Sequence, residues 1–574
     1  MIRGILKKSM PLLKRNVSKA TTRQIVYSRF ETAEIPNIPI EQLLWEHLEG
    51  FHDKTAIECA ITKRTYTYSE VYKKSIALAN FLNKLKNLKQ VDNAAIILPN
   101  VPEYIIVFLG AVQAGVKVAI VNCNSTNYEL KHLLTLCEAN LIFTTTNCYS
   151  TVATTIAHLN RNVSVVIVKT KKDEHLPDKT INFNEIVDGS CKKEFQTEHN
   201  FDETIMLGFS SGTTGLPKCV EFTNKNVVSS LVNLTAAPEI KFFDVAKGNH
   251  QEVILGNLPF SHVYGLVVVA LNALRHGCKI VTMTNFRSSI FLTALNEHPI
   301  RKLFLVPALS MRASVNIHNY FTYLSVQLLL HNPQITMKHL SSIETVTSAS
   351  NVLPIIDIQK FIDKTKGKIS VVQMYGLTEL TSITHSQMMN NFSINKIGAI
   401  GYSLPSVESK ILKITDGTEL GPNQLGEMYI RGPQVMKGYF KNEEATREIV
   451  DREGWVKTGD AGYYDDRGQF YIKSRIKDLI KVSGYQVSPG EIEELLKTHP
   501  GVKEAAVVGI PHPKLGEAPK AFVVPKSDTI LQPQQLRDYV KENLIHYKHL
   551  TGGVAIVNSI PKNSIGKVLK HLLK

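Results

Sequence analysis

Up to about Gly398, short apolar runs alternate with stretches whose apolar residues recur at helical spacing. The runs Asn93–Asn100 (NAAIILPN) and Val116–Asn122 (VKVAIVN) are typical of strands buried in a parallel sheet. The stretch between them, Val101–Gly115, has helical spacing and ends in glycine, which favours a helix. Similar strand-like runs recur at Glu252–Phe260, Arg301–Leu309 and Ile369–Gly376. The pattern predicts a doubly wound α/β fold.

Beyond Gly398, short strand-like segments separated by glycine turns indicate a small β-rich unit. The last hundred residues contain two predicted strands, at 504–511 and 518–525, and a predicted helix at 534–544. A chain of 574 residues is too long for one ordinary core. We place a domain boundary near Arg475–Asp478, which gives domains at residues 31–476 and 478–574.

Hydrophobic residues make up 43% of the chain and charged residues 20%, which is typical of a soluble globular protein. No apolar run approaches the roughly 20 residues that span a bilayer. The longest, Gly265–Leu274, is interpreted as a buried helix. The seven cysteines are scattered and form no C-x-x-C pair, which argues against a disulfide framework or a zinc site and suits a reducing compartment.

The net charge of +15 is concentrated at the N-terminus, where residues 1–30 carry eight Lys or Arg residues and no acid. This composition is typical of a mitochondrial presequence and predicts import into the matrix. A cytoplasmic protein with a basic tail, or with a basic helix on a membrane surface, is the alternative. The remaining positive charge forms no patch interleaved with aromatic residues, so nucleic-acid binding is not expected.

The stretch SSGTTGLPK places hydroxyls and glycines in front of Lys218. It is not the usual mononucleotide loop, because that loop has four residues between its glycines and then Gly-Lys-Ser/Thr. Hydroxyls and backbone N–H groups of such a loop can still follow phosphate oxygens. A glycine-serine surface turn is the alternative. The candidate phosphate ligands are Ser210, Ser211, Gly212, Thr213, Thr214, Gly215 and Lys218.

Further blocks follow in order: LPFSHVYGL (258–266), QMYGLTE (373–379), TGD (458–460), RIKDLIKVSGYQVSPGEIE (475–493) and IPKNSIGK (560–567). With the loop, they resemble the adenylate-forming superfamily of acyl-CoA synthetases, coumarate-CoA ligases, beetle luciferases and peptide-synthetase adenylation domains, over residues 35–574. The resemblance implies a large N-terminal AMP-binding domain and a small mobile α+β C-terminal domain. It also implies that a fatty or aryl acid is activated by ATP and Mg²⁺ as an acyl-adenylate, with release of pyrophosphate, and is then transferred to CoA.

The resemblance also implies roles for individual residues at the nucleotide. Lys218 steadies the leaving phosphates, Tyr375 packs against adenine and Thr378 contacts phosphate. Glu379 helps to hold Mg²⁺, as one carboxylate beside phosphate oxygens and waters. The rest of the implied nucleotide site is Gln373, Gly376, Leu377, Asp460 at the ribose hydroxyls and Arg475 at the ribose or phosphate. A helix-start or turn carboxylate and a surface arginine are the alternatives for Glu379, Asp460 and Arg475.

For catalysis, the resemblance implies that Lys567 stabilises the first transition state, and that the C-terminal domain then rotates about Lys477. Ser483 and Gly484 would line the thiol channel, and Lys481 is a candidate for the second step. His262 matches a histidine beside the carboxylate, and the acyl pocket includes Val263, Tyr264 and Met374. Surface lysines and a core histidine are the alternatives.

The sequence departs from the family pattern at one position beside the phosphate loop and at one position in the acyl pocket. Cys219 follows the loop lysine, where glycine is usual, and has no explanation in the sequence. Met374 stands where many members have glycine at the floor of the acyl pocket. A thioether there shortens or reshapes the pocket, which favours a medium or branched acyl group over a long chain.

Rival functions are activation of an acid for a carrier protein, luciferase-like oxidation, and a catalytically inactive nucleotide-binding scaffold. The joint presence of Lys218, Glu379, Asp460, Arg475 and Lys567 argues against the scaffold. The oligomeric state is left open by the sequence.

Overall fold

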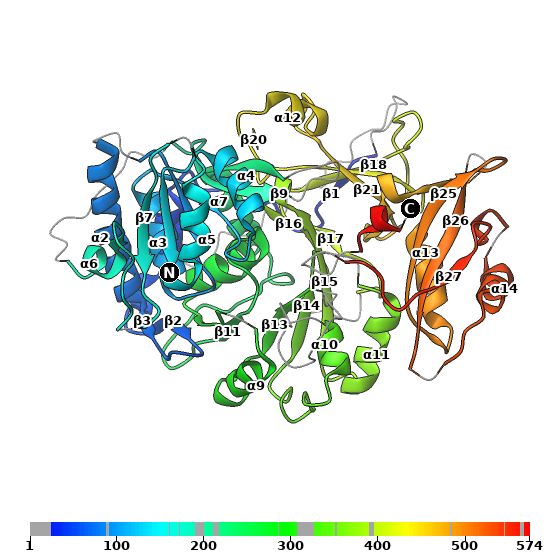
Figure 1. The fold of residues 1–574 in the computed structure, drawn as a ribbon, viewed down its shortest axis with the longest axis horizontal. Helices are drawn as coiled ribbons and strands as arrows, with labels where there is room; N and C mark the ends of the chain where they lie inside the picture. Colours follow the sequence, from blue (N-terminus) through cyan, green and yellow to red (C-terminus); the bar gives the residue numbers. More distant parts are fainter. Residues whose placement is uncertain are drawn as a thin grey trace, which may run out of the picture.

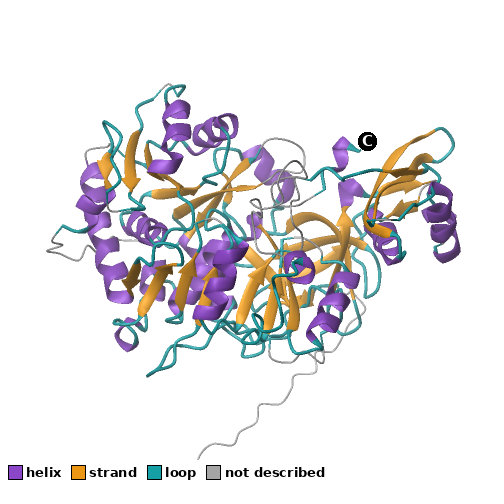
Figure 2. Cartoon of the chain, turned by 60° about the horizontal axis from the view of Figure 1, so that its bottom comes forward, coloured by secondary structure: helices purple, strands orange, loops and turns teal. Residues whose placement is uncertain are grey.

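The computed structural model of the chain describes residues 24–87, 91–159, 161–171, 173–189, 200–210, 217–284, 286–306, 326–350, 353–389, 395–482, 485–527, 529–544, 546–562 and 568–573. A large N-terminal domain is followed by a smaller C-terminal domain, orange to red in Figure 1. Strands lie inside and helices mostly outside (Figure 2). Among the described residues, no helix is long and apolar enough to cross a membrane.

The first unit is a sheet that is parallel at its centre and carries helices on its faces (Figure 1). Its central strand β4 (Asn93–Ile97) pairs in parallel with β5 (Lys117–Ile120) and β6 (Leu141–Thr145), which confirms the predicted buried strands. The remaining strands continue the order β20 (Gly438–Tyr439), β10 (Lys218–Thr223), β9 (Thr204–Ser210), β5, β4, β6, β7 (Ser164–Val168), β8 (Ile181–Asn182). Its helices are α2 (Tyr68–Asn87), α3 (Glu103–Gln113), α4 (Asn127–Cys137), α5 (Thr146–Ile156), α6 (Phe183–Val187) and α7 (Asn224–Asn233). Helix α3 confirms the helix predicted between β4 and β5.

The second unit contains the βα series predicted further along the chain. One sheet has the order β11 (Val253–Gly256), β12 (Lys279–Thr282), β2 (Thr55–Cys59), β3 (Thr65–Thr67). Another has the order β13 (Lys302–Leu305), β14 (Thr345–Ser348), β15 (Ser370–Leu377), β16 (Ser382–Ser386), β17 (Tyr402–Ser403). The accompanying helical segments are α1 (Ile40–Leu44), η1 (Leu48–Gly50), η2 (Tyr264–Leu271), α8 (Asn272–Arg275), α9 (Ser288–Glu297), α10 (Val326–His331), η3 (Thr378–Leu380) and α11 (Ile355–Thr365). Segments η2 and α8 are buried up to Leu274, as expected of Gly265–Leu274.

The third unit is the predicted β-rich unit, an antiparallel sheet. Its strand order is β1 (Val26–Tyr27), β18 (Glu408–Leu412), β19 (Gly426–Arg431), β21 (Val456–Tyr464), β22 (Phe470–Arg475), with helix α12 (Glu443–Ile449) beside it. Because β1 pairs with β18 and Phe30 is buried, residues 24–30 belong to this unit and not to a separate basic segment. The prediction of a segment at 1–30 was therefore too long, and its first 23 residues lie outside the described ones. Its targeting function stays a prediction.

The C-terminal domain begins after β22, where η5 (Ile476–Asp478) leads into β23 (Ile480–Val482). Its sheet has the order β24 (Tyr485–Val487), β23, β26 (Gly516–Pro525), β25 (Val502–His512), with β27 (Val554–Ile556) on β26. The helical segments are α13 (Pro489–Thr498), α14 (Pro533–Asn543), η6 (His546–Lys548) and η7 (Lys570–Leu572). The predicted strands and helix are confirmed by β25, β26 and α14. Residues of this sheet and of both α-helices form a hydrophobic cluster of their own.

Candidate active site

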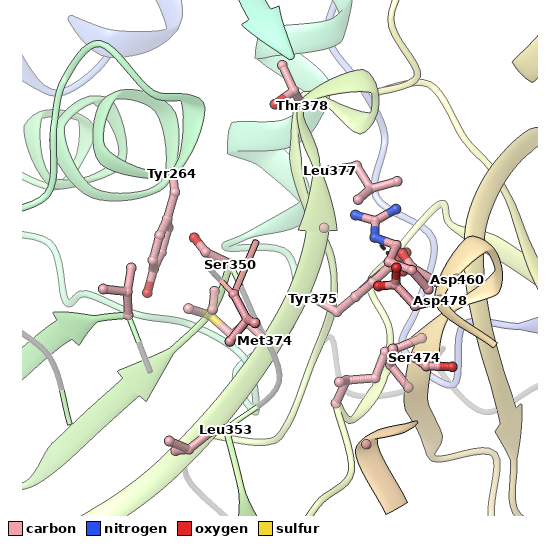
Figure 3. A pocket seen from close by; sticks show the side chains of 18 of the residues that line it. Tyr264, Ser350, Leu353, Met374, Tyr375, Leu377, Thr378, Asp460, Ser474 and Asp478 are labelled. Atoms are coloured by element: carbon pink, nitrogen blue, oxygen red, sulfur yellow. Dashed lines mark hydrogen bonds and ion pairs between the residues drawn. The ribbon is translucent and has the colours of Figure 1, made fainter. Parts of the chain in front are cut away.

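A cavity of about 1840 Å³ lies where the N-terminal domain meets the C-terminal domain. Its wall includes residues of β15, β21 and β22 from the N-terminal domain and of α13 and β25 from the C-terminal domain. Strand β15 runs through it, and successive side chains of a strand point to opposite faces. Met374 therefore points towards Tyr264 and Tyr375 towards Asp460 (Figure 3). The strand divides the cavity into two sides.

On one side, Tyr375, Asp460 and Arg475 form a connected group. The Tyr375 hydroxyl donates a hydrogen bond to Oδ2 of Asp460 over 2.7 Å. Nε of Arg475 lies 3.0 Å from Oδ1 of the same carboxylate. Asp460 and Arg475 are opposite each other on the antiparallel strands β21 and β22, and the side chain of Asp460 is only 5% exposed. The three predicted residues are thus brought together by two sheets.

The Asp460 carboxylate favours the protonated forms of both Tyr375 and Arg475. Burial, and then the Asp460 carboxylate, raise the pKa of Tyr375 well above its usual value, so its hydroxyl stays protonated and donates. Desolvation lowers the pKa of Arg475, but the charge of Asp460 and its neighbours outweighs it and the net pKa is raised. The arginine stays charged beside an ionised carboxylate, which can accept ribose hydroxyls.

A second group lies around Glu379, in η3 directly after β15. The hydroxyl of Tyr439 donates to Oε1 of Glu379 over 2.9 Å, and Nζ of Lys218 lies 4.9 Å from the centre of the Tyr439 ring. Burial, and then Glu379, raise the pKa of Tyr439. Tyr439 thus links the predicted phosphate lysine to the predicted metal carboxylate. Sequence analysis missed Tyr439, although it stands in the β-rich stretch GEMYIRGPQVMKGYF.

The surroundings of Glu379 fit a Mg²⁺ ion that is bound mainly through a nucleotide. Among the described residues, no cluster of three or more His, Cys, Asp or Glu side chains could hold a metal by itself. Glu379 offers one carboxylate beside Lys218 and Tyr439, which suits Mg²⁺, because this ion keeps several waters and takes phosphate oxygens as ligands. Bound there, Mg²⁺ neutralises phosphate charge.

Of the other predicted residues in the QMYGLTE block, two support the strand and two line the cavity. Gln373 donates its side-chain amide to the carbonyl of Ala399 over 3.0 Å, so this amide holds the strand in place. Gly376 is needed for close approach, since a Cβ there would lie 1.7 Å from the carbonyl oxygen of Ser382 on β16. Leu377 and Thr378 line the cavity (Figure 3).

The second side of the cavity has an apolar wall. Met374, Val263 and Tyr264 are buried and line it, and the Tyr264 hydroxyl lies 3.4 Å from Oγ1 of Thr347. His262 faces the same cavity, and its Nδ1 accepts the backbone N–H of Tyr264 over 3.2 Å. His262 is exposed at the cavity, yet desolvation by the surrounding walls lowers its pKa, which favours the neutral imidazole. The predicted acyl-pocket residues therefore lie together.

Several predicted residues lie outside the described ones, namely Ser211, Gly212, Thr213, Thr214, Gly215, Ser483, Gly484 and Lys567. The residues that border them can be placed. Ser210, Pro217 and Lys218, on either side of the loop, line the cavity, as do Lys562 and Val568 on either side of 563–567. Nε2 of His132 on α4 lies 3.1 Å from the carbonyl oxygen of Pro217.

Lys477 and Lys481 do not line the cavity as described. Lys477 lies in η5, between the domains, and Lys481 is exposed on β23, where its backbone N–H donates to Glu517. The cavity wall as described therefore includes Lys562 and Val568 and no residue of β23. A hinge at Lys477 and a second-step role of Lys481 stay predictions.

Cys219 points away from the cavity. It is buried beside Cys137 and Leu134 in a hydrophobic cluster between the first sheet and its helices, and burial raises the pKa of its thiol. A small apolar side chain suits this packing. The thiol is part of the core and not of the phosphate site.

Comparisons with known proteins agree with this geometry. The AMP-binding enzyme family matches residues 44–440, and the AMP-binding enzyme C-terminal domain matches residues 491–567. Probable 4-coumarate–CoA ligase 1 of Dictyostelium discoideum is 30% identical over 95% of this chain and 97% of that protein. For 4-coumarate–CoA ligase 2 of Solanum tuberosum, the identity is 31% over 96% of both chains.

Among solved structures, ATP-bound MatB from Rhodopseudomonas palustris is 25% identical, with a TM-score of 0.80 over 93% of this chain and 98% of that one. A benzoate CoA ligase from Burkholderia xenovorans LB400 shares the fold at 21% identity, with a TM-score of 0.77 over 93% and 99% of the two chains. The large and small domains, the cavity between them and these matches lead to one conclusion. The chain belongs to the AMP-binding, adenylate-forming enzymes of the CoA-ligase type.

Proposed function

We propose that this enzyme is an ATP-dependent acyl-CoA ligase. It joins a carboxylic acid to the α-phosphate of ATP, releases pyrophosphate, and then transfers the acyl group from AMP to the thiol of CoA. The observation that carries the proposal is the division of one cavity by β15: a polar group around Asp460 on one face and an apolar pocket around Met374 on the other. An acyl-adenylate needs these two environments side by side.

The described residues supply positioning and charge for the first step. Asp460, held by Arg475 and Tyr375, presents an oriented carboxylate to the ribose. Lys218 and Glu379, joined through Tyr439, lie on the phosphate side. Because attack on the α-phosphate places charge on oxygens, fixed cations and donors lower its barrier without reorganising at the moment of reaction.

The apolar side supports a fatty or aryl acid as the substrate. Val263, Tyr264 and Met374 bury an apolar group, and His262 lies on the same wall with a neutral ring that can bind a carboxyl group. The Met374 side chain is 4% exposed and occupies the pocket between Tyr264 and β15 (Figure 3). The pocket therefore favours an acid of medium length or a branched acid.

Met374→Gly is expected to raise kcat/KM for longer straight-chain acids at least about fivefold relative to shorter ones, because each accommodated methylene adds apolar burial. Initial rates over a series of acids of increasing length measure this. Met389→Ala is the matched control, since Met389 is also 4% exposed but does not line the described cavity. An unchanged order of preference in Met374→Gly would remove the argument for a shortened pocket.

A panel of fatty and aryl acids, assayed for pyrophosphate and AMP with and without CoA, tests the function. We expect pyrophosphate release that depends on one class of acid, and AMP release that CoA accelerates at least about tenfold, because the thiol is the acceptor. Acid-dependent pyrophosphate release without any effect of CoA would favour a carrier protein as acceptor, or oxidation of the adenylate. No acid-dependent release would contradict the enzyme assignment.

A further inference from the structure

His385 lies directly behind Tyr375, in a position that the family motifs do not cover. It is the cross-strand partner of Tyr375 on β16, and on its other side it pairs with Ser403 on β17. The two rings meet edge to face, with centroids 6.0 Å apart and an interplanar angle of 73°. His385 has no exposed surface, so its ring supports Tyr375 from inside the protein.

His385 also contacts the sheet that carries Asp460 and Arg475. Its Nε2 lies 3.1 Å from Oγ of Ser403 and 3.1 Å from Oγ of Ser409, which belongs to β18 of that sheet. Its ring meets Phe470 of β22 edge to face, with centroids 4.7 Å apart. Nδ1 lies 3.0 Å from the Thr384 hydroxyl. Both ring nitrogens thus have partners, and those of Nε2 come from both sheets.

The position of His385 is significant because Tyr375 and Asp460 come from different sheets. Tyr375 is on β15, and Asp460 is on β21, next to the β22 strand that carries Phe470. Their hydrogen bond of 2.7 Å depends on how these two sheets are placed against each other. A rigid ring with partners in both sheets limits sliding between them.

We propose that His385 is a positioning residue of the nucleotide site, which holds the two sheets so that Tyr375 meets Asp460 and thereby sets the affinity for the adenosine part of ATP and AMP. The inference rests on the proposed function. Burial lowers the pKa of His385 to about 3, so the ring is neutral at physiological pH and acts through packing and hydrogen bonds.

His276 provides a matched comparison, because it is a buried histidine without a link to the cavity. It is 5% exposed, its Nδ1 lies 2.7 Å from the carbonyl oxygen of Asn272, and its ring meets Phe243 edge to face. Burial lowers its pKa to about 4. If His385 were an ordinary core histidine, replacing His385 or His276 would lower stability alike and would change AMP binding in neither case.

The test is AMP binding by isothermal titration calorimetry, together with melting temperature, for wild type, His385→Gln and His276→Gln. We expect the Kd for AMP to rise about tenfold in His385→Gln, because misplacement of binding groups by a fraction of an ångström is costly. In His276→Gln, the Kd for AMP should stay within about twofold of wild type, while the melting temperature falls about as much as in His385→Gln. An unchanged Kd in His385→Gln, or an equal rise in both variants, would overturn the inference.

Ser409→Ala extends the test to a smaller change, since it removes one hydroxyl from Nε2 and leaves the ring. We expect a rise in Kd of about threefold, because a single hydrogen bond is lost; an unchanged Kd in a folded Ser409→Ala protein would contradict the proposal. In a Tyr375→Phe background, His385→Gln should weaken AMP binding less than in wild type, because the hydroxyl that His385 positions is gone. An equal effect in both backgrounds would also contradict it.

AMP binding needs neither the acid nor CoA, so the two proposals can fail separately. If the wild-type protein binds no AMP, the proposed function fails and this inference with it. If AMP binds equally to wild type and His385→Gln, the inference alone fails.

Discussion

Lys567→Ala is expected to slow acyl-adenylate formation at least about 100-fold and to leave thioester formation from a preformed acyl-adenylate within about twofold of wild type. The reason is that a cation beside the reacting carboxylate and α-phosphate stabilises charge that develops in the first transition state, and removal of one such donor typically costs 10²–10³-fold. The described flanks of residues 563–567 support this placement, because Lys562 and Val568 line the cavity that Tyr375 and Asp460 also line.

The measurements are acid-dependent exchange of pyrophosphate into ATP for the first step, and CoA consumption with a synthetic acyl-adenylate for the second. Lys541→Ala is the control, because Lys541 is exposed at the end of α14 in the same domain and does not line the cavity. Equal losses in both half-reactions of Lys567→Ala would show that the lysine supports the domain and not the first transition state.

For Asp460→Ala, we expect kcat/KM for ATP to fall at least about 100-fold. The carboxylate is the common partner of the Tyr375 hydroxyl and of Arg475, so its removal takes away the ribose acceptor and frees both neighbours. Removing one partner of a buried charge pair also destabilises a protein by about 3–5 kcal/mol. The loss of stability in Asp460→Ala is expected to be smaller than this, because the Arg475 side chain is 25% exposed and stays partly solvated.

Asp465→Ala separates the loss of stability from the loss of binding. Asp465 follows β21 in the same unit, its side chain is 9% exposed, and its Oδ2 lies 3.1 Å from Nζ of Lys396. Both variants should melt at lower temperature than wild type, while KM for ATP should rise in Asp460→Ala and stay within about twofold in Asp465→Ala. If Asp465→Ala raised KM for ATP as much, Asp460 would have no particular part in nucleotide binding.

Much of the fold is predictable because it follows from local periodicity. Strands β4 and β5 are visible as two apolar runs, since burial on both faces of a parallel sheet favours apolar residues along the strand. Helix α3 between them is visible as a stretch with helical spacing that ends in glycine. The predicted boundary at residue 30 was wrong because local signals do not report contacts that are distant in the chain. Basic residues dominate the segment, but Val26 and Tyr27 pair with β18, which lies far along the chain, and local composition does not report such pairing.

The candidate site was predictable where its residues stand in motifs, as with Tyr375 and Asp460. Tyr439 and His385 were missed, since neither residue type nor spacing marks them, and their importance comes from what they contact. Tyr439 reaches Glu379 across 60 residues of chain, and His385 reaches Ser409 across 24. Cys219 shows the converse: it follows a motif lysine, yet strand alternation turns it into the core.

The sequence by itself determined the family, the kinds of chemical group at the site and the two-domain plan, because these are carried by short motifs and by local patterns of burial. The tertiary structure alone decided that β15 separates a polar side from an apolar side and that Tyr375 donates to Asp460, 85 residues further on. It also decided that His385 joins the two sheets behind them. Contacts of this kind depend on how sheets pack over long separations in the chain, and only the packed core sets those distances.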